Sequence, residues 1–282
     1  MARTCTLCGE NLYILLAKFC TLYYTTYRTM AIEVFNRYEY KYKITEAELN
    51  KLLPVLEKHM LMDMHCKNHS LYTIANIYYD TYDDYLIRRS LQKPAYKEKL
   101  RLRAYEVPKL DSKVFLEIKK KGKGLVNKRR TTLILDEAYG FIQNGKMPEP
   151  KESMNTQVMH ELEYFLKVHN IMPKVYIAYD RLAYFENGND DLRISFDTTI
   201  RTRRHDLRLE AGDHGDLLLD EDVYIMEIKT SRAMPIWLTE LLTEMNMRRS
   251  SFSKYGTEFK EFMTSNTGVT ENFYQEIHKI AI

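Results

Sequence analysis

The chain has 282 residues, of which 45% are hydrophobic and 29% are charged, and its formal net charge is +3. This composition is that of a globular protein with room for one large domain or two small ones. A protein that merely coats an anionic surface is usually far more basic, so the composition argues against that class. Tyrosine is unusually frequent, at 22 residues, which favours a strand-rich fold.

The four cysteines give no sign of a metal site or of a disulfide framework. Cys5, Cys8 and Cys20 lie close to the N-terminus and Cys66 stands alone, without the second pair that a zinc finger needs. Free cysteines fit a reducing compartment, so we expect a cytoplasmic protein.

The N-terminal segment differs from the rest of the chain. Its apolar run, residues 12–24, is interrupted by Lys18 and has too few apolar residues to span a bilayer. Strand-like alternation begins only after Met30. We therefore predict that residues 1–29 form an N-terminal extension outside the fold and that residues 30–282 form one domain.

The first predicted elements alternate between strands and helices. Residues 35–44 alternate strictly, with charged side chains on one face and tyrosines with Ile44 on the other. Thr45 followed by Glu48 is a capping-box pattern and predicts the start of an amphipathic helix, which Pro54 should bend or shorten. Next we expect a strand at residues 71–79 and a short helix at residues 80–92.

Basic strand faces dominate the next part of the chain. In the stretch Lys97–Arg103 the residues Lys97, Lys99, Arg101 and Arg103 share one face of a predicted strand at 96–106. Further strands are predicted at residues 113–121 and 125–135 and, on either side of the turn ENGNDD, at 174–185 and 191–204. A helix is predicted at 156–168, a strand at 222–230 and helices from Met234 onward. On the inward parity of these strands lie Phe115, Glu117, Lys119, Lys121, Arg193, Ser195, Asp197, Thr199, Arg201, Arg203, Glu227 and Lys229.

At least five strands thus have one face crowded with ionisable groups and one that is mostly apolar. Solvent-exposed charged faces over a sandwich core would explain one such strand, but like charges on neighbouring strands repel one another. We therefore predict an α+β fold in which a closed antiparallel β-barrel of about eight strands has its charged faces inward and helices packed outside. Inward lysines and arginines need a polyanion, and a few carboxylates among them suggest a divalent metal bridging to phosphate. Nucleic acid is not expected, because it would need an open basic face.

The same residues carry a resemblance to a known family. The segments YEYKYKI, EKLRLRAY, FLEIKKK, YDRLAYF, DLRISFDTTI, IMEIKT and FSKYG, between residues 35 and 256, occur in the order found in the polyphosphate polymerase (VTC) domain. That domain belongs to the triphosphate tunnel metalloenzymes, or CYTH-like superfamily. The resemblance implies transfer of the ATP γ-phosphate onto inorganic polyphosphate, with Mn²⁺ or Mg²⁺ as cofactor.

Site residues follow from the resemblance position by position. It implies catalytic roles for Lys41, Arg101, Arg103, Lys119, Arg181 and Arg193, and metal binding by Glu227. Lys254 matches a lysine near the end of the domain and is expected to bind phosphate. By strand parity we add Lys43, Lys99 and Lys229 to the phosphate-binding residues. Glu39 and Glu117 are interpreted as partners in structural salt bridges.

One departure from the superfamily pattern bears on the activity. The hydrolytic members open with Glu-x-Glu-x-Lys, whereas this chain has Glu39-Tyr-Lys41-Tyr-Lys43. Losing one carboxylate favours a more cationic site and a single metal, and so favours the polymerase over a triphosphatase. A triphosphatase and a non-catalytic module that binds polyphosphate or nucleotide stay open as alternatives. So does membrane association through a membrane-protein partner that would receive the product.

Overall fold

The computed structural model describes residues 38–66, 70–122, 125–187 and 189–267. All of them belong to one compact unit, Phe35–Ile282. The predicted extension at residues 1–29 lies outside the described residues, and the boundary at Met30 stays a prediction.

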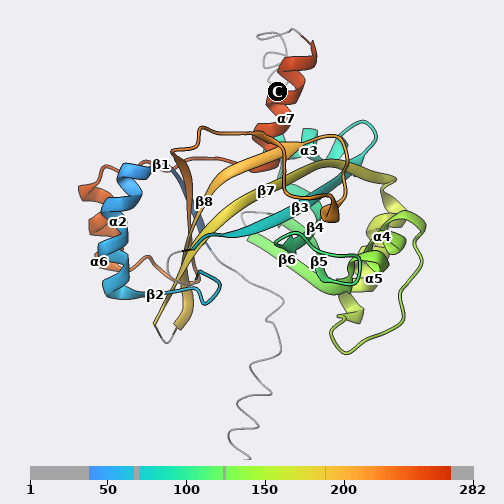
Figure 1. Cartoon of the computed structure of the whole chain (residues 1–282), viewed down its shortest axis with the longest axis horizontal. Helices are drawn as coiled ribbons and strands as arrows, with labels where there is room; N and C mark the ends of the chain where they lie inside the picture. The colour runs from blue at the N-terminus through green and yellow to red at the C-terminus, as the bar shows by residue number, and fades with distance from the viewer. Residues whose placement is uncertain (1–37, 67–69, 123–124, 188, 268–282) are drawn as a thin grey trace, which may run out of the picture. The chain divides into compact units, whose positions relative to one another are not determined.

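An antiparallel sheet forms the centre of the described unit (Figure 1). Eight strands follow one another in the order β1-β10-β8-β7-β3-β4-β5-β6, while β2 pairs with β7 and β9 pairs with β8. The sheet is therefore ten-stranded, where about eight strands were predicted, and the two additional strands are short. The strands are β1 Tyr38–Thr45, β2 Met60–Met62, β3 Tyr72–Thr81, β4 Tyr96–Tyr105, β5 Lys113–Gly122, β6 Leu125–Ile134, β7 Ile171–Glu186, β8 Asn189–Arg203, β9 Asp216–Leu217 and β10 Val223–Thr230.

Helices cover the outer, apolar faces of the strands. Figure 1 shows α2 and α6 side by side, with α4 and α5 together beside β5 and β6. The predicted capping box is present, since the Thr45 and Glu48 side chains exchange hydrogen bonds with each other's backbone N–H, and the helix continues past Pro54 to His59. The helices are α2 Glu46–His59, α3 Tyr85–Leu91, α4 Leu135–Asn144, α5 Thr156–Val168, α6 Ile236–Glu244 and α7 Lys254–Thr267.

Two clusters of buried apolar side chains hold the helices to the sheet. Leu100 and Leu102 of β4 pack in one cluster with Phe141 of α4 and Leu162 of α5. The other cluster joins Ile44 of β1 and its neighbours to α2, α6 and α7. Burying each of these large side chains contributes about 1.5–3 kcal/mol, and the arrangement directs the opposite, charged strand faces inward.

The prediction of a closed barrel needs correction. Among the described strands, β1 and β6 stand at the two ends of the order and share no backbone pairing. The outer edge of β1 is instead occupied by the chain before α7, where the Ser250 N–H donates to the Lys41 carbonyl at 2.7 Å and Arg249 forms a bridge with Tyr42. Because this segment uses the hydrogen-bonding groups of that edge, the sheet is not closed by hydrogen bonds.

A bulge in β8 corrects a second expectation. Thr199 has a positive φ of 47°, and the pairing register shifts between Ala178 and Asp180. One extra residue reverses the parity beyond it, so Arg201 and Arg203 leave the inward face. Arg201 instead binds Asp180, with Nη1 2.7 Å from a carboxylate oxygen, and Arg203 lies 3.6 Å above the ring centroid of Tyr176.

Candidate functional site

Charged side chains line the inward face of the curved sheet from β1 to β6. The pairing register places Lys41 beside Glu227, Arg181 beside Asp197 and Arg101 beside Glu117. It also places Lys119 between Lys99 and Lys128. We call this set the polar interior; its members are Glu39, Lys41, Lys99, Arg101, Arg103, Glu117, Lys119, Lys128, Arg181, Asp197, Glu227 and Lys229, with Lys254 reaching in from α7.

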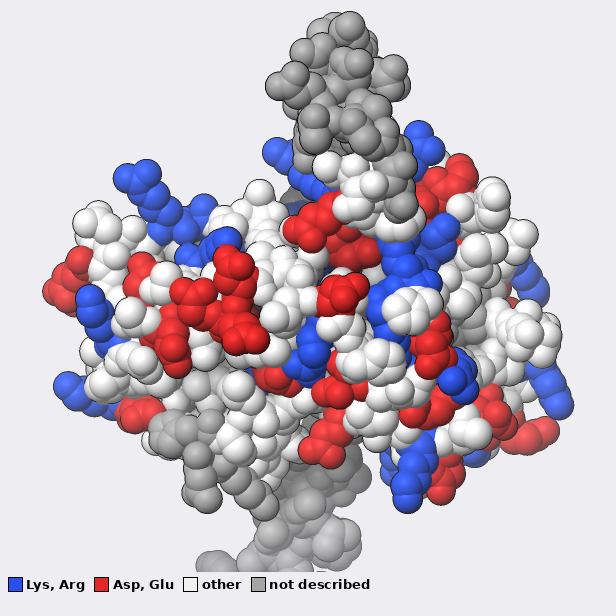
Figure 2. Space-filling model, turned by 45° about the horizontal axis from the view of Figure 1, so that its top comes forward, with Lys and Arg blue, Asp and Glu red and all other residues white. Residues whose placement is uncertain are grey.

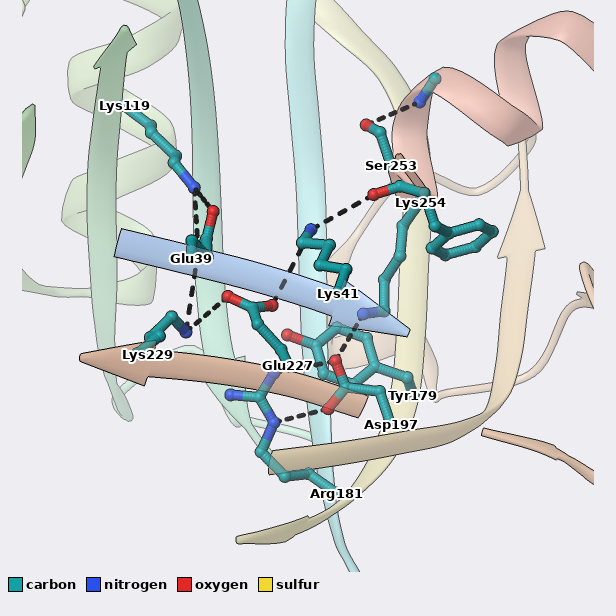
Figure 3. A network of polar contacts seen from close by, with 12 residues as sticks. Glu39, Lys41, Lys119, Tyr179, Arg181, Asp197, Glu227, Lys229, Ser253 and Lys254 are labelled. Carbon is teal, nitrogen blue, oxygen red and sulfur yellow. Dashed lines mark hydrogen bonds and ion pairs between the residues drawn. The ribbon is translucent and has the colours of Figure 1, made fainter. Parts of the chain in front are cut away.

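Glu227 on β10 lies between two lysines (Figure 3). Its carboxylate is 2.8 Å from Lys229 Nζ and 3.8 Å from Lys41 Nζ. Burial by itself would raise the pKa of the Glu227 carboxyl, but the ammonium groups of Lys229 and Lys41 outweigh it and hold this pKa well below its usual range. Glu227 is therefore ionised at neutral pH.

Asp197 on β8 anchors the first residue of α7 to the sheet. Arg181 Nε and Nη2 donate to its two carboxylate oxygens at 2.6 and 2.9 Å, and Lys254 Nζ donates to the same carboxylate. The Lys254 ammonium also lies 4.1 Å from the ring centroid of Tyr179 (Figure 3). The bidentate contact fixes the Arg181 guanidinium in one orientation, with its charge inside the polar interior.

Glu117 on β5 gathers three cations. Its carboxylate is 2.7 Å from Arg101 Nε, 3.9 Å from Arg103 Nε and 2.5 Å from Lys128 Nζ, and its side chain is 1% exposed. Arg103 also donates to Asn76 Oδ1 at 2.9 Å and to the Tyr179 hydroxyl at 3.0 Å. Both arginines are thus held by neighbouring side chains in the ligand-free protein, which agrees with interpreting Glu117 as a salt-bridge partner.

The inward lysines of β4 and β5 have different partners. Lys99 Nζ donates to the Ser253 hydroxyl at 3.3 Å. Burial, together with the positive charges of Lys97 and Lys119, lowers the pKa of Lys99 to about 7. Lys119 pairs with Glu39 of β1 at 3.2 Å. A low lysine pKa marks a place where an anion would be favoured.

Two predicted site residues, Lys43 for phosphate binding and Arg193 for catalysis, lie apart from this network. Lys43 is exposed near the end of β1. Arg193 shares the inward face, but it pairs with Asp63 at 3.4 Å and lies 4.7 Å above the Phe185 ring centroid. Sequence reasoning gave no site role to Asp197, Lys128 or Ser253, although the inward parity of Asp197 was visible in the sequence.

The comparisons with known proteins bear on this arrangement of inward cations. Residues 36–263 match the model of the VTC domain. The chain belongs to the VTC domain family. This confirms the resemblance drawn from the seven sequence segments, whereas a comparison with curated protein sequences gives no match.

Several solved structures resemble this VTC domain in outline. A candidate adenylate cyclase from Bacillus halodurans is 13% identical, with 79% of this chain and 96% of that chain covered and a TM-score of 0.48. A candidate adenylyl cyclase from Hippeastrum with a dominant triphosphatase activity is 14% identical, with 78% of this chain and 93% of that chain covered and a TM-score of 0.46. The Mimivirus capping enzyme triphosphatase is 11% identical, with 86% of this chain and 98% of that chain covered and a TM-score of 0.33. At these identities and TM-scores the likenesses assign no activity to this VTC domain.

Within the described ranges, no group of three or more His, Cys, Asp or Glu side chains is placed to hold a metal ion by itself. No helix in the same part of the chain is long and apolar enough to cross a membrane. Figure 2 shows basic and acidic side chains interspersed over the visible face.

Proposed function

We propose that this VTC domain is a polyphosphate polymerase that transfers the γ-phosphoryl group of ATP onto the end of an inorganic polyphosphate chain. The observation that carries the proposal is the convergence of cations from separate elements on the polar interior. Lysines from β1, β4, β5, β10 and α7 meet there with Arg181 of β7 and outnumber the carboxylates. Such an excess of inward positive charge is costly unless a polyanion neutralises it.

Phosphoryl transfer requires little more of the protein than positioning and charge neutralisation. Arg181 and Arg101 are oriented by Asp197 and Glu117, so each presents a fixed charge to the phosphates. Lys99, Lys119 and Lys254 add further positive charges on long side chains. In the reaction the bond between the γ-phosphorus and the β–γ bridging oxygen breaks, a bond to a terminal oxygen of the polymer forms, and ADP leaves. That terminal phosphate is already ionised near neutral pH, so no strong general base is needed.

The carboxylates present fit a metal that is bound jointly with substrate. Mg²⁺ and Mn²⁺ sites of this kind use one or two carboxylates and complete their coordination with phosphate oxygens and water. Glu227 and Glu39, which share Lys229 as a partner at 2.8 and 4.0 Å, are the residues that would hold it. When bound, the metal would supply further neutralisation of phosphate charge. Without a metal, the positive charges of Lys229 and Lys41 offset the negative charges of the two carboxylates.

A tunnel-type triphosphatase is the second candidate, and a binding module without turnover is the third. The residue at the second acidic position of the hydrolytic pattern is Lys41, whose Nζ donates to the Phe252 carbonyl at 3.3 Å and lies 3.8 Å from Glu227. A lysine in this place favours retention of a long anion over a second metal. This supports the polymerase but leaves hydrolysis as the outcome to test against.

The test is to incubate the purified chain with ATP and Mn²⁺ and to separate free phosphate from polymer. The proposal predicts chains of increasing length. Release of phosphate alone would assign a triphosphatase, and binding without turnover would assign a binding module. In the Glu227→Gln variant, metal-free ATP binding should stay level or tighten, while metal-dependent turnover should fall by roughly two orders of magnitude or more. The exposed Glu240→Gln is the matched control.

A further inference from the structure

The chain between α6 and α7 passes along the outer edge of β1. Residues 247–253 belong to no helix or regular strand, and we call them the β1-edge segment. In its middle, the Ser250 N–H donates to the Lys41 carbonyl at 2.7 Å, and the Arg249 guanidinium lies 4.2 Å from the ring centroid of Tyr40. These contacts place the segment directly beside the polar interior.

The sequence of the β1-edge segment has the form that protein kinases with a preference for basic substrates select. Arg248 and Arg249 stand three and two residues before the hydroxyl of Ser251, and the large apolar side chain of Phe252 follows it directly. Such kinases pair the two arginines with carboxylates, and the two parallel hydrogen bonds that each guanidinium can make give the recognition its specificity. Arg248, Arg249 and Ser251 are all exposed, so a kinase can reach them.

The fold separates this stretch from a second one with the same spacing. Residues 129–132 also read Arg-Arg-Thr-Thr, but they lie within β6, where Thr132 is paired with β5 and Arg129 is bound to Glu161 at 3.1 Å. A kinase must hold its substrate as an extended segment in its own cleft, so it would first have to pull β6 out of the sheet. Ser251 lies outside the regular strands and helices, so the structure favours modification there.

The residues that follow Ser251 already contact inward cations through oxygen atoms. The Phe252 carbonyl accepts a hydrogen bond from Lys41 Nζ at 3.3 Å, and the Ser253 hydroxyl accepts one from Lys99 Nζ at 3.3 Å (Figure 3). A phosphate group on Ser251 would add a charge of roughly −1.5 to −2 within two residues of both contacts. It would therefore compete with a bound phosphate chain for the same lysines.

We propose that Ser251 is a phosphorylation site for a protein kinase that selects arginine-containing sequences, and that its phosphorylation weakens the binding of a phosphate chain in the polar interior. The kinase uses ATP as co-substrate. The bond between the γ-phosphorus and the β–γ bridging oxygen breaks, a bond from the Ser251 oxygen to that phosphorus forms, the hydroxyl proton passes to the general base of the kinase, and ADP leaves. The effect on binding rests on the proposed function, whereas the modification itself does not.

The first experiment incubates the whole folded chain with ATP, Mg²⁺ and the catalytic subunit of cyclic-AMP-dependent protein kinase, and locates phosphate by mass spectrometry of its peptides. Phosphate should appear on Ser251 and not on Thr132. Ser251→Ala should abolish this signal, and Arg248→Gln should slow its appearance roughly tenfold, the scale of one charged contact. Ser250→Ala is the matched control and should be phosphorylated like the wild type. Absence of phosphate on Ser251, an equal rate in Arg248→Gln, or phosphorylation without added kinase would overturn the assignment.

The second experiment measures the affinity for inorganic tripolyphosphate by calorimetry before and after phosphorylation. The affinity of the phosphorylated chain should be roughly threefold lower, the scale of a partly screened charge pair, and the difference should shrink as salt is added. Kinase-treated Ser251→Ala should bind like the untreated chain. An unchanged affinity after phosphorylation would overturn the effect on binding and would show that the new phosphate pairs with other cations. If the untreated chain binds no tripolyphosphate, the proposed function fails, while phosphate found on Ser251 still supports the modification site.

Discussion

Lys119 on β5 and Glu39 on β1 form an ion pair in which Nζ and a carboxylate oxygen are 3.2 Å apart. The two strands share no backbone pairing among the described strands, so their side chains meet across the inside of the curved sheet. Lys229 approaches the same Glu39 carboxylate at 4.0 Å (Figure 3). In the ligand-free protein, Glu39 therefore neutralises lysines that a phosphate chain would otherwise engage.

This relationship predicts that Glu39→Gln strengthens metal-free binding of tripolyphosphate. Removing the competing carboxylate frees Lys119 and Lys229, and the side chains are partly exposed, so we expect a modest gain of roughly threefold. Calorimetric titration without divalent metal measures it, with Glu240→Gln as the control. Weaker binding in Glu39→Gln would show that Glu39 orients the lysines for phosphate and does not compete with it.

Glu117 should be essential for stability. Its carboxylate is buried among Arg101, Arg103 and Lys128, and Glu117→Gln would leave these cations without their common partner. We expect a loss of about 3–5 kcal/mol in the free energy of unfolding, measured by urea titration. A variant as stable as the wild type would contradict a structural role for this cluster.

The same carboxyl predicts a pH dependence of stability. Burial would raise the pKa of Glu117, but the charges of Arg101, Arg103 and Lys128 hold it well below its ordinary value of 4.5. A carboxyl whose pKa is lower in the folded state stabilises fully above its unfolded pKa, and this contribution is lost as the pH falls through the folded pKa. Urea titrations from pH 6 downward should show a smaller acid-dependent loss in Glu117→Gln than in the wild type.

Lys99 predicts a pH dependence of binding. Burial and the charges of Lys97, Lys119 and Lys41 lower the pKa of its amine to about 7 in the free protein. Bound phosphate favours the charged amine, so above pH 7 binding must take up a proton and the affinity should fall as the pH rises. Titrations in buffers of different ionisation enthalpy measure the uptake, which should be smaller in Lys99→Met than in Lys58→Met. Equal proton uptake in both variants would show that Lys99 does not take part in phosphate binding.

Deletion of residues 1–29 should leave folding and phosphate binding intact. The family match begins at residue 36, and the inward charges begin at Glu39. We expect the melting temperature and the tripolyphosphate affinity of the truncated chain to equal those of the whole chain. A large fall in melting temperature would place part of this segment within the fold.

Strand alternation predicted much of this arrangement because the period of two is a local property of the backbone. It placed Lys41, Lys99 and Lys119 on one face, although their roles stay predictions. It failed beyond Thr199, where one inserted residue reverses the parity, and alternation carries no signal for such a bulge.

Other features depend on contacts between distant parts of the chain. Lys254 sits on a helix and reaches Asp197 only through the packing of α7, so alternation could not select it. The segment along the β1 edge is likewise held by a hydrogen bond from the Ser250 N–H to the Lys41 carbonyl, which the local sequence does not predict. Helix α4 was not predicted, although its sequence LDEAYGFIQN places Leu135, Ala138 and Phe141 in the core.

The most direct test of the central claim is the affinity of the whole chain for inorganic tripolyphosphate, measured by calorimetry in Lys254→Met and in Lys58→Met. Lys254 reaches the polar interior from α7, while Lys58 is exposed on α2. If the inward cations bind the phosphate chain, the first variant should lose roughly tenfold or more in affinity, the scale of one charged hydrogen bond, and the second should match the wild type. Equal affinities in both variants, or wild-type binding too weak to measure, would contradict the claim.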